Sequence, residues 1–191
     1  PILHESIRNL YFHVPMWFTM IVLFSISVVY SVRYLGSGDE HHDLLAVECV
    51  NTGMIFTFLG LTTGMIWANF TWGSPWPDDP KLNSAAIAAL MYLAYLVLRN
   101  SLDEEQKRAK ISAIYNIFAY PVMIVLLFVL PRMTDSLHPG NGGNPGFNSY
   151  DLDNNMRWVF YPAVLGWILL GIWIATLRFR IRKIENKHNA V

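Results

Sequence analysis

The sequence predicts an all-α fold, a polytopic bundle of five transmembrane helices, and three observations lead to this prediction. The chain is 53% hydrophobic and 14% aromatic, which exceeds what a soluble domain of 191 residues usually carries. Its apolar residues are gathered into five stretches that together hold only two charged residues, Arg33 and Glu48. Most Lys and Arg residues lie in alternate connections between these stretches, as in membrane proteins of fixed orientation.

Each apolar stretch is about long enough to cross a hydrocarbon core roughly 30 Å thick at about 1.5 Å per residue. Helices buried in a soluble core normally keep a polar stripe, which these stretches lack. Arg33 and Glu48 lie near the inner ends of their stretches, where we expect them to reach the headgroups. We therefore treat residues 1–191 as one domain in the lipid bilayer. Its spans are predicted at residues 14–34, 44–67, 82–98, 111–130 and 158–177.

The orientation follows from the positive charges. Ten of the fourteen Lys and Arg residues lie on one face, at Arg33, in the connection 99–110 and in the tail 178–187. That face should be cytoplasmic, so the N-terminus of this chain should lie outside and the C-terminal tail inside. The formal net charge of zero argues against a nucleic acid partner. The single cysteine, Cys49, falls inside a span and can form no intrachain disulfide.

Three features inside or beside the spans have more than one interpretation. Gly53, Gly60 and Gly64 share one helical face, which favours close helix packing or, alternatively, a smooth wall for a flat ligand. Pro121 should kink the fourth span because it removes a backbone donor. His41 and His42 form a pair beside acidic residues that is typical of a solvated surface more than of a metal site.

Aromatic residues and histidines gather on the face predicted to be outside. The connection 68–81 and the residue before it contain three Trp, and the connection 131–157 is rich in glycine. His13 begins the first span and His138 follows the fourth, so both should project over one outer cavity. Two imidazoles on opposite sides of an iron, among aromatic planes, are a way in which proteins hold haem. The alternative is that these residues only anchor the helices at the membrane interface.

Four segments, in this order, resemble the CcmC family, the small members of the haem-handling, tryptophan-rich WWD-domain proteins of cytochrome c biogenesis. The resemblance covers nearly the whole chain. The segments contain Phe12-His13-Val14-Pro15, Gly60-Leu61-Thr62-Thr63-Gly64, Trp72-Gly73-Ser74-Pro75-Trp76 and Leu137-His138-Pro139-Gly140. Family members of this size have six spans, so we expect a further span upstream of Pro1. The resemblance also implies the bacterial inner membrane, with the cavity at its periplasmic face.

The resemblance implies a role for individual residues. His13 and His138 would be the axial iron ligands of a non-covalently bound haem b. The indoles of Trp72, Trp76 and Trp67 and the ring of Phe70 would stack on it or cover it. Arg8 and Lys81 would face its propionates, with Arg132 and Arg157 as weaker candidates. The chain departs from the family pattern at Asp78, which replaces a Trp, and at Lys81, which replaces an Arg that would grip a carboxylate with two bonds.

The function implied is that of a membrane protein that collects haem and presents it to a periplasmic haem chaperone. Other membrane subunits of cytochrome c maturation, including an ABC-type ATPase complex, are the expected partners. We expect haem delivery, a haem-lyase-like role, and no conventional catalysis. Three alternatives stay open: the haem-attachment component of a cytochrome c synthase, which needs a second His pair, a membrane assembly subunit without a cofactor, and a haem transporter. The last is disfavoured because the spans hold no ATP-binding motif and no acidic residue besides Glu48.

Overall fold

The structure is a computed structural model that describes residues 4–139, 147 and 151–189, and it confirms the predicted helical fold. Five of its helical segments are long and apolar enough to cross a membrane, and the described residues contain no strand. A 3-10 turn, η1 (His4–Asn9), leads into the first of them. The α-helices are α1 (Leu10–Ser37), α2 (Glu40–Trp72), α3 (Pro80–Asn100), α4 (Glu105–Ile124) and α5 (Asn154–Asn189).

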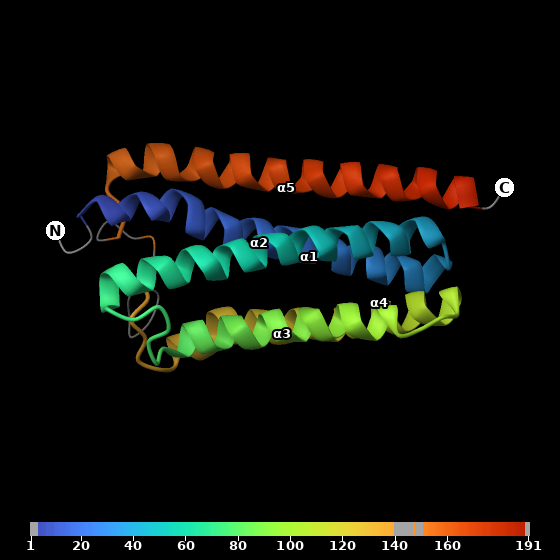
Figure 1. Ribbon diagram of the computed structural model, residues 1–191, viewed down its shortest axis with the longest axis horizontal. Helices are drawn as coiled ribbons and strands as arrows, with labels where there is room; N and C mark the ends of the chain where they lie inside the picture. The colour runs from blue at the N-terminus through green and yellow to red at the C-terminus, as the bar shows by residue number, and fades with distance from the viewer. Residues whose placement is uncertain (1–3, 140–146, 148–150, 190–191) are drawn as a thin grey trace.

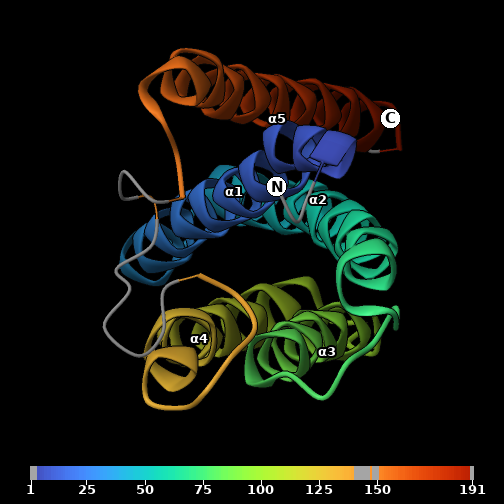
Figure 2. The ribbon, with the colours of Figure 1, turned by 90° about the vertical axis from the view of Figure 1, so that its left-hand side faces the viewer.

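The helices form three layers (Figures 1 and 2). The central layer contains α1 and α2, with α5 on one side and the pair α3 and α4 on the other. The N-terminus lies at one end of the bundle and the C-terminus at the opposite end (Figure 1). The connection from α2 to α3 and the segment that follows α4 lie at the N-terminal end, so both predicted outer connections are on one side of the molecule.

Short polar motifs set the ends of the helices. Gly38, at φ 70°, ends α1 with its N–H donating to the carbonyl of Tyr34, and the Asp39 carboxylate then caps α2 by accepting from the backbone of His41. This connection is too short to allow anything but antiparallel neighbours. At the other end, α2 continues five residues beyond the predicted span and stops at Gly73, which has φ 76°. The aromatic segment is therefore partly helical.

The α1–α2 contact explains the three glycines of α2. A Cβ atom at Gly53 would collide with the Phe24 ring of α1, and one at Gly60 would lie 3.0 Å from Cε2 of Trp17. A Cβ atom at Gly64 would lie 2.7 Å from Cε1 of His13. The glycine face thus provides close helix packing. Gly60 and Gly64 also form part of the wall of a cavity at the N-terminal end, so the two interpretations do not exclude each other.

The layer of α3 and α4 is joined to α1 by hydrogen bonds inside the bundle. The amide Nδ2 of Asn116 in α4 donates to Oγ of Ser27, at 2.7 Å, and to Oγ of Ser31, at 2.9 Å. Pro121 lies inside α4, and four residues later the helix changes into a π-helical segment, η2 (Val125–Val129), followed by η3 (Leu130–Arg132). This irregular end leads directly into the loop that carries His138.

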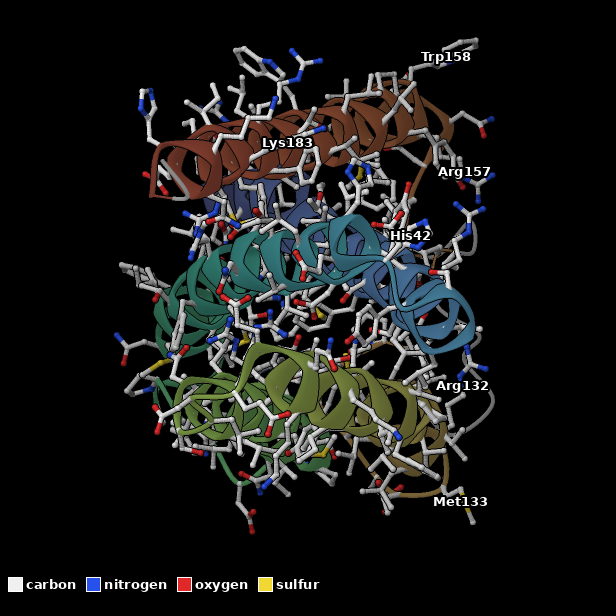
Figure 3. All side chains as sticks on the ribbon, turned by 90° about the vertical axis from the view of Figure 1, so that its right-hand side faces the viewer. His42, Arg132, Met133, Arg157, Trp158 and Lys183 are labelled. Atoms are coloured by element: carbon white, nitrogen blue, oxygen red, sulfur yellow. The ribbon has the colours of Figure 1, made fainter. Side chains whose placement is uncertain are left out.

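At the C-terminal end of the bundle, α5 is fastened to α2 by charged groups. Glu48 is 1% exposed, and its carboxylate binds Arg178, at 2.8 Å, and Arg182, at 3.2 Å. Glu48 therefore does not reach the headgroups as expected, because the two guanidinium groups of α5 compensate its burial. Figure 3 views the molecule from this end, where Lys183 of α5 and His42 of α2 are labelled.

Candidate functional site

The N-terminal end of the bundle contains a cavity of about 760 Å³, a volume within the usual range for small-molecule sites of roughly 300–1,000 Å³. Its walls come from η1, α1, α2, the start of α3, η2, η3, the segment after η3 and the start of α5 with the residues just before it. Most of the lining is apolar and includes Trp17, Phe18, Leu127 and Phe128 in addition to the residues that the sequence predicted. The helix bundle thus holds open a space for a large, mainly apolar ligand.

His13, on the first turns of α1, lines this cavity and is held by α2. Its Nδ1 lies 3.0 Å from the carbonyl oxygen of Gly60 and 3.2 Å from Oγ1 of Thr63. A carbonyl oxygen only accepts, so Nδ1 carries the hydrogen and Nε2 keeps the lone pair that can bind a metal. The missing side chain of Gly64 leaves room for the ring.

His138, in the loop after η3, lines the same cavity from the opposite layer. Its Nδ1 lies 3.0 Å from Oδ1 of Asp79, and its side chain is 20% exposed. An ionised carboxylate only accepts hydrogen bonds, so Nδ1 of His138 carries the hydrogen. In the neutral ring, Nε2 is then again the atom with the free lone pair. The structure therefore brings together the two histidines that the sequence singled out and prepares both in the same tautomer.

Asp79 is a residue of this site that the sequence analysis did not identify. Its carboxylate is buried and caps α3 by accepting from the backbone of Lys81, at 3.0 Å, and Leu82, at 3.2 Å. Burial alone would raise the pKa of Asp79, but the hydrogen bonds from His138, Ser136 and the backbone of Leu137 outweigh it and lower that pKa below its usual value. The group is therefore an anion at neutral pH. An Asp before Pro80 is a recognisable helix cap, which is a local signal for this residue.

The predicted tryptophans flank the two histidines. The ring of Trp67 lies edge-on to His13, with centroids 5.9 Å apart, and the ring of Trp72 lies edge-on to His138, with centroids 4.9 Å apart. Trp76 also lines the cavity and donates its indole N–H to Oδ1 of Asn83 at 3.1 Å. Each histidine thus has an aromatic neighbour that restricts the orientation of its ring.

Two of the predicted cations line the cavity. The Lys81 ammonium donates to the backbone carbonyl of Pro139 at 3.4 Å, next to the His138 loop. Arg132 also lines the cavity and lies at the edge of the molecule in Figure 3. A ligand with carboxylate groups would meet these two charges at the cavity wall.

Three of the candidate residues lie elsewhere. The Arg8 side chain is 77% exposed and pairs with Glu5 at 2.7 Å. Phe70 is 77% exposed and faces a shallow groove on the outer side of α2. Arg157 donates to the carbonyl of Phe147 at 3.4 Å and, with Trp158, projects from the edge of the bundle (Figure 3). None of the three lines the cavity within the described residues.

The histidine pair of α2 lies at the C-terminal end, far from the cavity. His41 packs edge-on against Phe179 of α5, and Nδ1 of His42 lies 3.1 Å from Oγ of Ser37. The described residues contain no group of three or more His, Cys, Asp or Glu side chains placed to hold a metal ion. A haem iron needs only two such ligands, so this finding does not bear on His13 and His138.

Comparison with known proteins gives a family. The model of the CcmC family, heme exporter protein C, matches residues 3–191. The chain belongs to this family. It is 26% identical over 186 residues to heme exporter protein C of Haemophilus influenzae, covering 95% of this chain and 73% of the relative. It is 32% identical over 150 residues to heme exporter protein C of Bradyrhizobium diazoefficiens, covering 76% of this chain and 56% of the relative.

A second kind of relative matches part of this CcmC family member. Cytochrome c biogenesis protein CcsA of Prochlorococcus marinus is 40% identical over 82 residues, which are 43% of this chain and 26% of the relative. The chain thus spans about three quarters of the Haemophilus relative, just over half of the Bradyrhizobium relative and a quarter of CcsA. The predicted resemblance to the CcmC family is confirmed.

Proposed function

We propose that this membrane protein handles haem in cytochrome c biogenesis, holding it in the cavity between His13 and His138 and presenting it to a periplasmic haem chaperone. The observation that carries the proposal is that both histidines line one apolar cavity with Nδ1 occupied and Nε2 available. Bis-imidazole ligation needs two such rings on opposite walls. The names of the relatives, which refer to heme export and cytochrome c biogenesis, support the same role.

The residues present fit a haem in size and chemistry. The cavity volume suits a large flat ligand, and its aromatic and aliphatic walls suit the macrocycle. Lys81 and Arg132 supply positive charge for the propionates. Cys49 is buried in the bundle core and 5% exposed, so the bound haem would be non-covalent and of the b type. Haem supplies the iron that the two imidazoles bind, and the protein supplies orientation and release.

The site residues of the proposal are therefore fewer than the sequence alone indicated. His13 and His138 ligate the iron, and Trp67, Trp72 and Trp76 cover the ring. Arg8, Phe70 and Arg157 are left out because their side chains are not among the described residues that line the cavity. In the membrane, the N-terminal end of the bundle would face the periplasm and the tail of α5 the cytoplasm, in accordance with the distribution of Lys and Arg.

The partial similarity to the cytochrome c biogenesis protein CcsA is compatible with a second candidate, a haem-attachment component of cytochrome c assembly. Such a component would need a second pair of histidines. Of the other histidines in the described residues, His41 and His42 lie at the opposite end of the molecule and do not line the cavity. A haem count per chain separates the two: one haem supports delivery from a single site, and two support the second candidate.

The test of the proposed function is a haem titration of the purified protein in detergent. We expect one haem per chain with a six-coordinate, low-spin absorption spectrum, and colour that acid-acetone extracts completely. His13→Ala and His138→Ala should each lose this spectrum, whereas His188→Ala, at an exposed position on the tail of α5, should keep it. Wild-type spectra in both cavity variants would overturn the proposal, as would haem that remains attached to the polypeptide.

A further inference from the structure

The carboxylate of Asp79 ties together two parts of the chain that are far apart in sequence. Its Oδ1 accepts from two backbone N–H groups at the start of α3 and from His138, while its Oδ2 accepts from Oγ of Ser136, at 2.8 Å, and the backbone N–H of Leu137, at 2.7 Å. The segment 136–138 is therefore fixed against the first turn of α3. This one buried anion thus holds both the His138 ring and the backbone that carries it.

The two histidines therefore differ in the group that accepts the hydrogen bond from Nδ1. Nδ1 of His13 donates to a neutral acceptor, the Gly60 carbonyl, with the neutral Thr63 hydroxyl beside it. Nδ1 of His138 donates to a charged one, the Asp79 carboxylate. A carboxylate behind an imidazole makes the ring a more basic ligand and fixes its orientation more firmly than a carbonyl group does.

We infer that Asp79 is a positioning residue that makes His138 the anchoring axial ligand and leaves His13 as the ligand that is released first. This inference rests on the proposed function. During hand-over, the bond between iron and Nε2 of His13 would break while the bond to Nε2 of His138 holds. The His13 side of the cargo would then be open to an incoming ligand from the partner, and no electron transfer is needed.

Replacing Asp79 by Asn removes the charge and keeps one acceptor oxygen for the helix cap. Asn caps helices about as well as Asp, so Asp79→Asn should keep the start of α3. Its amide Nδ2 donates and cannot accept from Ser136 and Leu137, so the variant removes the charge and also loosens the segment that carries His138. The matched control is Asp39→Asn, since Asp39 caps α2 in the same way, at the opposite end of the molecule. Any effect of losing a cap charge in general would appear in both variants.

The first readout is the midpoint potential of the bound haem, measured by spectroelectrochemistry. Loss of the anion should weaken the ferric state more than the ferrous state. A tenfold difference, the lower end of what such orienting groups contribute, raises the potential by about 59 mV for one electron. Asp39→Asn should leave the potential unchanged. An unchanged potential in Asp79→Asn, or an equal rise in the control, would overturn the inference.

The second readout compares the single variants His13→Gly and His138→Gly for haem retained after gel filtration. We expect His13→Gly to retain several times more haem than His138→Gly, with added imidazole restoring the six-coordinate spectrum of either. Introducing Asp79→Asn should remove most of this difference. Equal retention in the two single variants would overturn the inference and leave the proposed function intact. The proposed function fails separately if wild-type protein takes up no haem in the titration.

Discussion

Gly64 of α2 lies directly behind the ring of His13, so close that a Cβ atom added there would be 2.7 Å from Cε1 of the imidazole. Such a separation is well inside van der Waals contact. The ring could not keep its place, and the hydrogen bond from Nδ1 to the Gly60 carbonyl would be strained or broken. The small residue on one helix therefore determines the position of a ligand on the next.

This contact predicts that Gly64→Ala weakens haem binding although Ala favours a helix over Gly by about 1 kcal/mol. We expect affinity to fall roughly 10- to 100-fold, as for other losses of groups that orient a metal ligand. Haem titration in detergent measures this. Gly166→Ala in α5 is the control, because a Cβ atom there meets nothing within 4 Å. Equal affinities for the two variants would contradict the prediction.

The contact between Trp72 and His138 predicts a smaller effect. The two rings meet edge-on with an interplanar angle of 66°, an arrangement that contributes about 1 kcal/mol beyond the area it buries. Trp72→Ala should therefore reduce haem affinity about fivefold or more. The haem that remains should keep the wild-type spectrum, since both ligands are intact. Trp158→Ala should have no effect, because that indole is 81% exposed outside the cavity. A changed spectrum would mean that Trp72 determines ligation itself.

A comparison of Lys81 with Lys107 distinguishes the effect of a positive charge in the cavity from the effect of a positive charge elsewhere on the protein. Lys81 lines the cavity, whereas Lys107 is exposed near the start of α4. If Lys81 faces a propionate, Lys81→Gln should lower haem retention and Lys81→Arg should preserve or increase it, since a guanidinium binds a carboxylate with two hydrogen bonds. Lys107→Gln is expected to behave as the wild type. Equal retention in Lys81→Gln and Lys107→Gln would show that the cavity cation makes no contribution.

Local sequence signals were sufficient for the spans and for the two histidines and three tryptophans of the cavity. Apolar stretches of the right length gave five helices, and both histidines could be singled out because each stands beside a span end. Phe70 was misplaced for a simple reason. The helix α2 continues to Trp72, so Trp67, Ala68, Thr71 and Trp72 face the cavity together, while Phe70 falls on the opposite side of the same turns.

The link between Asp79 and His138 could not be found in this way. The two residues are 59 positions apart, and their contact depends on how α3 packs against the end of α4. Periodicity describes one helix at a time and carries no information on such a contact. The pairing of Glu48 with Arg178, across 130 positions, was missed for the same reason.

The proposed orientation predicts which positions a membrane-impermeant maleimide can reach in whole cells. Met133 is 78% exposed at the N-terminal end of the bundle, and Lys187 is exposed on the tail of α5. In a Cys49→Ser background, Met133→Cys should be labelled in intact cells and Lys187→Cys only after the inner membrane is permeabilised. The reverse pattern would place the cavity on the cytoplasmic side and remove the basis for a periplasmic partner.

Because Glu48 is buried, removing its two arginine partners should destabilise the protein more than removing Glu48 itself. Glu48 is 1% exposed, whereas the side chains of Arg178 and Arg182 are 39% and 49% exposed. Replacing both arginines by Ala leaves an unpaired buried anion, which should lower the free energy of unfolding by about 3 to 5 kcal/mol. Glu48→Gln should cost less, because the released guanidinium groups regain water. Combining all three changes should recover part of the loss, since no uncompensated charge then remains.

Thermal unfolding in detergent measures each variant, and Arg180→Ala with Lys183→Ala is the control for the loss of two exposed charges from α5. A double arginine variant no less stable than this control would show that Glu48 is neutral or solvated, and that α5 is held to α2 by apolar packing alone.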